Sequence, residues 1–211
     1  MTYAADVATL ARKDLLLEVR ARDTLPAMLL FVLSALAIFH FALPGGTSRL
    51  AALGLLWLAI VFTSLLGLTR AFVPEREEGV LDGLVLAPCD RSAIWLGKVV
   101  AVLVFLALAE IVALPAFALF FSSVDGATIA AVALADVGIC SVGAFVGAMA
   151  TATRARELLL PLLFLPLAIP VVVGGVGASA TGGARYLLFL VLYDAVFTLL
   201  AWASFEYVVT E

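Results

Sequence analysis

Six long apolar runs constrain this chain more than any other feature of its sequence. A helix needs about 20 predominantly apolar residues to cross the hydrocarbon core of a bilayer, and inside the bilayer only helices and closed barrels satisfy their own backbone hydrogen bonds. The runs cover residues 25–43, 50–73, 99–121, 127–150, 158–176 and 186–209. The sequence therefore predicts an all-α, polytopic membrane protein in which residues 1–211 form one transmembrane domain with six spans.

The composition excludes a soluble globular domain. Hydrophobic residues make up 65% of the 211 positions and charged residues 13%, far from the values typical of soluble proteins. The net charge of −4 is small, and the basic residues lie near the ends of the apolar runs, which indicates no nucleic-acid partner. The two cysteines, Cys89 and Cys140, lie in a polar segment and in an apolar run. Their positions predict neither a disulfide nor a metal site.

The distribution of Lys and Arg predicts the orientation in the membrane. Ten of the twelve basic residues precede the first run, lie from the end of the second run to the start of the third, or lie between the fourth and fifth runs. These ten are Arg12, Lys13, Arg20, Arg22, Arg70, Arg76, Arg91, Lys98, Arg154 and Arg156. The remaining two, Arg49 and Arg185, lie in the other loops. Because cytoplasmic loops hold the excess of basic residues, we expect both termini to be cytoplasmic.

Residues 1–24 are charged and weakly amphipathic. One side of the segment is apolar, and charged residues border it; the apolar side holds Ala8, Ala11, Leu15 and Val19. No small-x-small cleavage site follows the first apolar run, as a signal peptide would require. We therefore expect an interfacial helix that leads into the first span.

The longest polar interruption, residues 70–98, lies between the second and third runs. Pro74 suits the first position of a helix, because its missing N–H would be unpaired there in any case, and Pro88 suits the end. At 100° per residue one face of this helix is acidic with two glycines, and the other is apolar. The acidic face holds Glu75, Glu78, Gly79, Asp82 and Gly83, and the apolar face holds Val80, Leu81, Leu84 and Val85. We predict an amphipathic element over residues 74–98 that lies along the cytoplasmic membrane surface.

Two interpretations of this element are open. It can rest on lipid headgroups, or it can dock on a protein. An acidic face with glycines suits close packing on a protein better than contact with anionic lipid, so we favour docking. The candidate docking residues are Glu75, Arg76, Glu78, Gly79, Asp82, Gly83 and Leu84.

The fourth and fifth runs have unusual residues for a helix interior. The fourth carries Gly138, Gly143 and Gly147, which predicts close packing against a neighbouring helix. The fifth carries three prolines, Pro161, Pro166 and Pro170. Each removes a backbone hydrogen bond and favours a kink. Both a helix that moves during transport and a statically kinked helix fit this pattern.

Three acidic residues lie within the apolar runs: Glu110, Asp136 and Asp194. A carboxylate is costly in hydrocarbon, so these side chains are expected to face the bundle interior or a cavity, or to be protonated. One interpretation is a substrate path or proton relay. The other is a set of neutral acids that hydrogen-bond between helices, and because no basic partner is visible in the runs, we slightly favour it.

His40 is the single histidine and falls near the outer end of the first span. It is a weak candidate for a haem ligand, because no second His, cysteine pair or nearby Met accompanies it. An interfacial polar residue is the favoured interpretation. The sequence also has no G-x-x-x-x-G-K-[ST] phosphate-binding loop. If transport by this chain is driven by ATP, a partner must supply the ATPase.

The segment FVPEREEGVLDGLVLAPCDRSAIWLGK resembles the loop between the second and third spans of ABC-2-type permeases, through its E-R-E-x-G, L-x-x-L, Pro and Gly-Lys landmarks. Its D-G-L-x-L-A-P-x-D-R-S run is the more specific part. Together with the N-terminal DLLLEVRARD, it resembles the CcmB family, the haem-exporter permease subunits of cytochrome c maturation. The likeness extends over essentially the whole chain, because six spans and this length also fit.

This resemblance implies a non-enzymatic permease subunit in a bacterial inner membrane. The implied partners are a cytoplasmic CcmA-like ATPase, a CcmC-like haem-handling subunit and a small CcmD-like subunit, with this chain as a homodimer. ATP would act only through the ATPase. Haem would be cargo rather than a tightly bound cofactor, supplied to a periplasmic haem chaperone. Two routes fit this resemblance: haem crosses through this subunit, or ATP energy releases the loaded chaperone. The absence of a convincing axial ligand pair favours the second route.

Two other functions are compatible with the sequence. One is an ABC-2 permease for another cargo, such as a lipid-linked glycan or a drug. The other is a proton-coupled secondary transporter that uses the three intramembrane acids as a proton path. The second alternative needs no ATPase and leaves the predicted cytoplasmic helix without a role.

Overall fold

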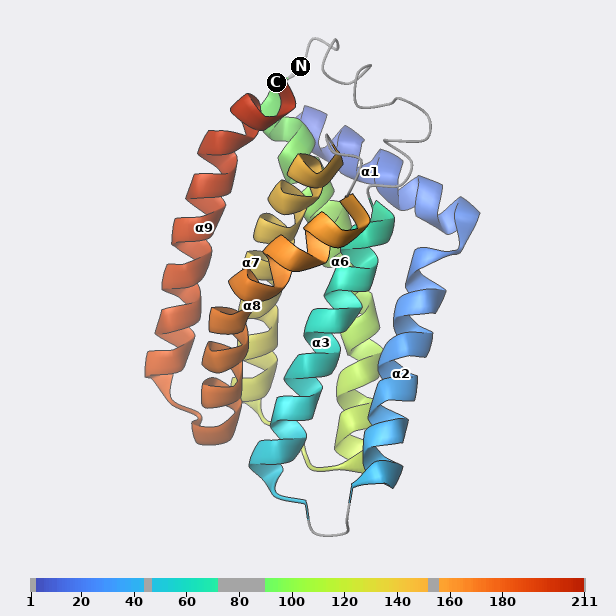
Figure 1. Ribbon diagram of the computed structural model, residues 1–211, viewed down its shortest axis with the longest axis vertical. Helices are drawn as coiled ribbons and strands as arrows, with labels where there is room; N and C mark the ends of the chain where they lie inside the picture. The colour runs from blue at the N-terminus through green and yellow to red at the C-terminus, as the bar shows by residue number, and fades with distance from the viewer. Residues whose placement is uncertain (1–2, 44–46, 72–89, 152–155, 211) are drawn as a thin grey trace.

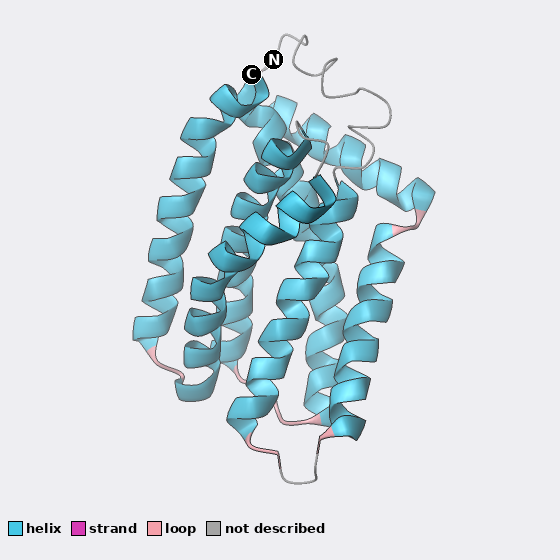
Figure 2. Ribbon diagram, in the orientation of Figure 1, coloured by secondary structure: helices cyan, strands magenta, loops and turns pink. Residues whose placement is uncertain are grey.

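The computed structural model describes residues 3–43, 47–71, 90–151 and 156–210. Within these ranges the chain consists of helices joined by short turns, and none of the described residues forms a strand (Figure 2). The helices are α1 (Tyr3–Ala21), α2 (Thr24–Ala42), α3 (Arg49–Ala71), α6 (Arg91–Phe120), α7 (Gly126–Thr151), α8 (Arg156–Thr181) and α9 (Ala184–Thr210). The predicted all-α class is confirmed.

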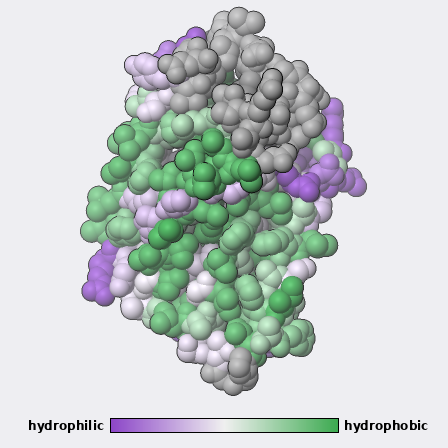
Figure 3. Space-filling model, viewed as in Figure 1, coloured by the Kyte–Doolittle hydropathy of each residue, from purple (hydrophilic) through white to green (hydrophobic). Residues whose placement is uncertain are grey.

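Among the described helices, six are long and apolar enough to cross a membrane: α2, α3, α6, α7, α8 and α9. They lie alongside one another as a bundle (Figure 1). Apolar residues cover most of the middle of the face shown in Figure 3, and the most hydrophilic residues lie at its margins. α7 and α3 are the most buried spans, and α2 and α9 the least. The prediction of six spans is confirmed.

α1 crosses one end of the bundle instead of running with the spans (Figure 1). We call this the α1 end; α9 finishes there too. The tightest contact is with α6, where a Cβ placed on Gly97 would lie 2.8 Å from Leu10 Cβ and 3.4 Å from Ala11 N. A side chain at position 97 would therefore push α1 away. The predicted separate N-terminal helix is confirmed.

The buried face of α1 differs from the predicted one. Val19 was expected on the apolar side, but it is 65% exposed, and Ala8 is exposed as well. Asp14 instead forms an ion pair with the buried Lys98 of α6, and Glu18 accepts hydrogen bonds at the start of α2. The face is rotated because these two acids find partners on the bundle.

α6 begins at Arg91, earlier than the predicted third span, which started at residue 99. Asp90 occupies the N-cap, and its Oδ1 accepts hydrogen bonds from the Ser92 backbone N–H at 2.9 Å and from the Ser92 hydroxyl at 2.7 Å. Such a cap satisfies backbone donors that the first turn leaves unpaired. The last part of the predicted cytoplasmic element therefore belongs to α6.

Glycines allow close packing between the spans. A Cβ at Gly143 of α7 would overlap the Leu68 side chain of α3, and a Cβ at Gly175 of α8 would overlap the Trp57 ring. Gly138 of α7 is equally close to α9. The close packing predicted for Gly138 and Gly143 is confirmed.

α8 is a continuous helix despite its three prolines, and it changes direction along its length (Figure 1). Prolines remove N–H donors and leave carbonyls that need other partners. In the turn before Pro170, the Tyr193 hydroxyl of α9 donates a hydrogen bond of 2.7 Å to the Leu167 carbonyl. The fifth span is thus bent without a break, and α9 supplies a donor at the bend.

Asp125 organises the end of the bundle opposite α1. Its Oδ1 accepts hydrogen bonds from the Thr128 hydroxyl at 2.6 Å and the Thr128 backbone N–H at 2.8 Å. Its Oδ2 lies 2.9 Å from Arg49 Nη2, at the start of α3. The Thr128 hydrogen bonds, followed by the Arg49 contact, lower the pKa of Asp125 from its ordinary value. Asp125 therefore joins the beginnings of α3 and α7.

We expect Asp125→Ala to cost about 1 kcal/mol of stability, because it removes an N-cap acceptor. This corresponds to a decrease in Tm of about 2–4 °C for a chain of this size, measured by tryptophan fluorescence in detergent at pH 7. Asp125→Asn is the matched control. It retains a capping oxygen and loses only an exposed ion pair, so its effect is expected to stay below about 1 kcal/mol.

The effect of the alanine substitution also depends on pH. Folding lowers the pKa of Asp125. The contribution of this carboxylate to the free energy of unfolding is therefore complete above the unfolded-state pKa of about 3.9, and it is lost as the pH falls through the folded-state pKa. The Tm difference between wild type and Asp125→Ala is expected to shrink in acid. Equal Tm values at pH 7 would contradict the proposed role of the cap.

Candidate functional site

The seven predicted docking residues lie in segment 72–89, outside the described residues. Their role remains a prediction. The structure does place both flanks of the segment: α3 ends at Ala71, and α6 begins at Arg91. Both flanks lie at the α1 end of the bundle (Figure 1). The predicted docking segment therefore leaves and re-enters the bundle beside α1.

The three intramembrane acids come together inside the bundle. Glu110 lies on α6, Asp136 on α7 and Asp194 on α9, and these three helices contact one another. Their exposed fractions are 6%, 4% and 8%. The carboxyl groups of Glu110 and Asp136 lie within hydrogen-bonding reach of each other. Asp194 lies close enough to Asp136 for an electrostatic interaction between the two carboxyl groups. The Asp194 carboxyl group also packs against Gly138, where a Cβ would collide with it.

Each of these carboxyl groups keeps one buried oxygen without a hydrogen-bond partner: Glu110 Oε1, Asp136 Oδ1 and Asp194 Oδ1. Removing a polar group from water without a hydrogen bond is costly, and a charge costs more. Lys98, the buried base of α6, is ion-paired with Asp14 at the α1 end. The described residues thus provide the acids with no basic counter-ion. Sequence reasoning identified the three acids, and the structure shows that they form one cluster.

His40 lies at the opposite end, in the last turn of α2. Its ring stacks on Phe120 with centroids 5.2 Å apart and meets Phe41 and Phe121 edge-on at 5.2 and 5.7 Å. Within the described part of the chain, no group of three or more His, Cys, Asp and Glu side chains is arranged to hold a metal ion. His40 therefore lies among phenylalanine rings at this end of the bundle, and its role as a weak candidate haem ligand stays a prediction.

A charged junction at the α1 end was missed by the sequence reasoning. Lys98 Nζ lies 2.8 Å from Asp14 Oδ2 on α1. The same ammonium group donates a hydrogen bond of 2.9 Å to the carbonyl of Ala71, the last residue of α3. A single buried side chain therefore connects α1, α3 and α6 next to the predicted docking segment.

The turn between α1 and α2 strengthens this junction. Glu18 Oε1 accepts a hydrogen bond from the Thr24 backbone N–H at 2.5 Å, so α1 supplies the acceptor that the first turn of α2 needs. Arg22 adopts a left-handed conformation with φ of 57°. Arg70 Nη1 donates to the Asp23 carbonyl at 3.3 Å. The i, i+4 spacing of Asp14 and Glu18 places both on one helix face. This spacing is the feature of the sequence from which the charged junction could have been predicted.

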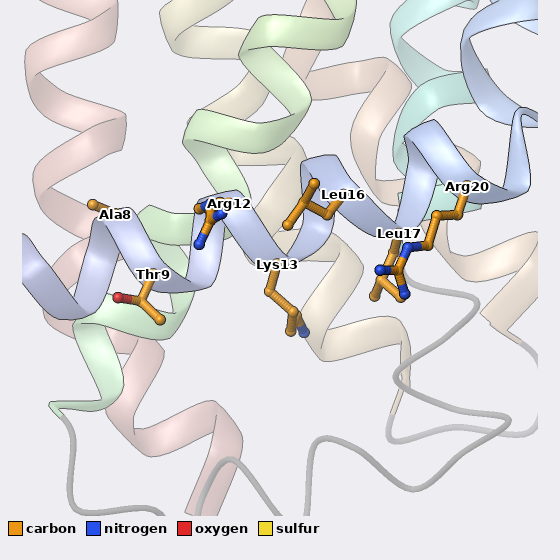
Figure 4. A pocket seen from close by; sticks show the side chains of 7 residues that line it. All are labelled: Ala8, Thr9, Arg12, Lys13, Leu16, Leu17 and Arg20. Carbon is orange, nitrogen blue, oxygen red and sulfur yellow. The ribbon is translucent and has the colours of Figure 1, made fainter.

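The outward face of α1 lines a cleft of about 470 Å³ (Figure 4). The lining residues are Ala8, Thr9, Arg12, Lys13, Leu16, Leu17 and Arg20. Three of these side chains are basic, so this surface favours anionic groups. A second cavity of about 230 Å³ lies where α1, α2, α3 and α6 meet, and Asp14, Glu18 and Lys98 line part of it. The α1 end thus combines a basic outer cleft with a charged junction.

Comparison with known proteins covers nearly the whole chain. The sequence profile of the CcmB protein family matches residues 5–206. The chain is 30% identical over 178 residues to heme exporter protein B of Bradyrhizobium diazoefficiens, which covers 82% of this chain and 80% of that protein. It is 31% identical over 177 residues to heme exporter protein B of Paracoccus denitrificans (82% and 81%) and 31% identical over 174 residues to that of Pseudomonas aeruginosa (80% and 78%). The chain belongs to the CcmB protein family.

Proposed function

We propose that this chain is the permease subunit of an ABC transporter complex for c-type cytochrome biogenesis. In this role it couples ATP hydrolysis by a separate ATPase subunit to haem export or to release of a haem-loaded chaperone. The observation that carries the proposal is the family match over residues 5–206. The similar proteins named heme exporter protein B support haem as the cargo, and the six spans suit a permease.

The α1 end is proposed to face the cytoplasm of a bacterial inner membrane. The basic residues in the described ranges support this orientation. Those near the α1 end are Arg12, Lys13, Arg20, Arg22, Arg70, Arg91, Lys98 and Arg156, and those near the opposite end are Arg49 and Arg185. The excess of Lys and Arg marks the cytoplasmic side. In this orientation both termini and the predicted docking segment meet a cytoplasmic ATPase.

The charged junction gives the proposed ATPase a mechanical connection to the spans. Lys98 binds the last residue of α3 and Asp14 of α1, so the two flanks of the predicted docking segment are held at one point. A force applied to that segment acts on α1, α3 and α6 together. This supports coupling through movement of helices rather than through chemistry performed by this chain.

The proposed complex contains a CcmA-like ATPase, a CcmC-like haem-handling subunit, a CcmD-like small subunit and a second copy of this chain. Haem is cargo in this proposal. His40 has phenylalanine rings around it, and this setting favours ATP-driven release of a haem-loaded chaperone over haem ligation by this subunit. The ABC-2 permease for another cargo stays an alternative; it predicts an ATPase partner without a haem-binding subunit.

The proposed orientation can be measured with reporter fusions after Arg22, Ala87 and Glu211. All three reporters are expected to be active in the cytoplasm. The three fusion points lie on the side of the membrane predicted to hold ten of the twelve basic residues, and that excess marks the cytoplasmic side. A fusion after Thr47 is the control, and it is expected to report the opposite side. A periplasmic result at Ala87 would refute docking of a cytoplasmic ATPase.

The docking role is tested by Gly79→Leu and by the double substitution Glu75→Lys with Glu78→Lys. Docking energy concentrates in a few central residues, and a bulky side chain in a tight contact disrupts packing on both partners. We expect each variant to insert in the membrane but to weaken ATPase co-purification about tenfold or more, with failure of cytochrome c maturation.

Gly54→Leu is the matched control for these substitutions, because a Cβ at Gly54 meets no neighbouring atom within 4 Å. It is expected to retain the ATPase and normal maturation. Wild-type ATPase recovery in both docking variants would show that the segment only rests on lipid. A complex that contains an ATPase but no haem-binding membrane protein would favour a different cargo.

The charged junction generates a separate prediction. Lys98→Met is expected to cost about 1–3 kcal/mol, because it removes the buried partner of Asp14 and leaves that carboxylate, among the described residues, paired only with Lys13. The double variant Lys98→Met with Asp14→Leu is expected to recover most of the Tm but to lose ATPase stimulation. Arg91→Gln is the control: its ion pair with Glu206, at 3.5 Å, is exposed and is worth about 1 kcal/mol or less. Normal stimulation in the double variant would remove the junction from the coupling path.

A further inference from the structure

The three acids within the spans have buried oxygens for which the surrounding residues provide no hydrogen-bond partner. Glu110, Asp136 and Asp194 come from three different spans and are each more than nine-tenths buried. Each points an oxygen without a hydrogen-bond partner into the interior. Gly138 creates the space that the Asp194 carboxyl group occupies. An arrangement in which three helices direct unsatisfied acids toward one place points to a ligand that the acids bind.

The proximity of the buried Glu110 and Asp136 carboxyl groups indicates the chemistry of that ligand. An ionised carboxylate only accepts hydrogen bonds, and a protonated one has an O–H group to donate. Two carboxyl groups can therefore hydrogen-bond each other only when at least one carries a proton. A close pair of buried carboxyl groups across α6 and α7 therefore favours one bound proton.

Among the described residues near the three acids, no basic side chain is placed to neutralise them. On α7, Cys140 is one helical turn from Asp136 and is a buried thiol. On α9, the Tyr193 hydroxyl already donates to the Leu167 carbonyl of α8. On α6, Lys98 is held by Asp14 of α1. The described ranges also contain no group of three or more His, Cys, Asp and Glu side chains arranged to hold a metal ion.

We propose that Glu110, Asp136 and Asp194 form an intramembrane proton-binding site, in which Glu110 and Asp136 share one proton and Asp194 lies beside them as a further acceptor. When the O–H bond breaks and the proton leaves to water, two negative charges remain in contact across α6 and α7. Like charges at this separation in a low-dielectric interior repel strongly. Protonation thus stabilises the packed arrangement of these spans, whichever cargo the permease carries.

The test is infrared difference spectroscopy on the purified full chain in lipid nanodiscs. We expect the carbonyl stretch of a protonated carboxylic acid at pH 7, which shifts in D₂O and is lost at high pH. Because the proton is shared, both Glu110→Gln and Asp136→Asn are expected to remove or shift this band. These amides are close in size to the acids and can still hydrogen-bond, so the fold is expected to persist, as checked by Tm.

Asp125→Asn is the matched control, because Asp125 lies in an exposed turn outside the spans, and it is expected to leave the band unchanged. The wild-type spectrum alone can refute the proposal: without a protonated carboxyl band at pH 7, the acids are ionised. A band that neither Glu110→Gln nor Asp136→Asn alters would refute it as well. These results leave the haem-export proposal untouched, because they require neither ATPase nor cargo.

Discussion

Hydrocarbon provides no hydrogen-bond partner, and this constraint governs every polar feature of the bundle. The buried polar side chains of the spans therefore bind within the protein. Trp57 Nε1 donates to Ser179 Oγ at 3.2 Å, and Trp95 Nε1 donates to the Ser141 carbonyl at 3.3 Å. The Thr63 hydroxyl donates a hydrogen bond to the backbone carbonyl of Ala59 in its own helix. Against this background the three unsatisfied oxygens of the acid cluster stand out, because the remaining buried side-chain atom of the described residues that has no partner, Ser122 Oγ, lies alone in the turn between α6 and α7.

The same constraint explains why a charged helix forms part of this fold. α1 has only a narrow apolar strip on the bundle, in which Ala11 is buried and Leu10 and Leu15 pack against the core. Polar contacts add to it: an ion pair between Asp14 and Lys98 and the cap that Glu18 provides for α2. α1 is therefore part of the structural core at this end and more than a leader to the first span.

Hydropathy predicted the number of spans because crossing a bilayer requires a length of apolar sequence that is visible residue by residue. It could not predict how each helix is rotated. The depth of Glu110, Asp136 and Asp194 was readable from the sequence, but their convergence depends on the packing of α6, α7 and α9. For the same reason Val19 was placed on the wrong side of α1: ion pairing by Asp14 decided the rotation, and that pairing involves a residue more than eighty positions away.

α6 connects the two polar sites of this protein. Lys98 binds α1 and the end of α3 near its beginning, and Glu110 reaches Asp136 farther along the same helix. Twelve residues of helix separate them, about 18 Å at 1.5 Å per residue. A helix is stiff over this length, so a tilt imposed where Lys98 is held changes the distance between Glu110 and Asp136. The proposed proton-sharing contact therefore lies on the element that the proposed cytoplasmic ATPase would move.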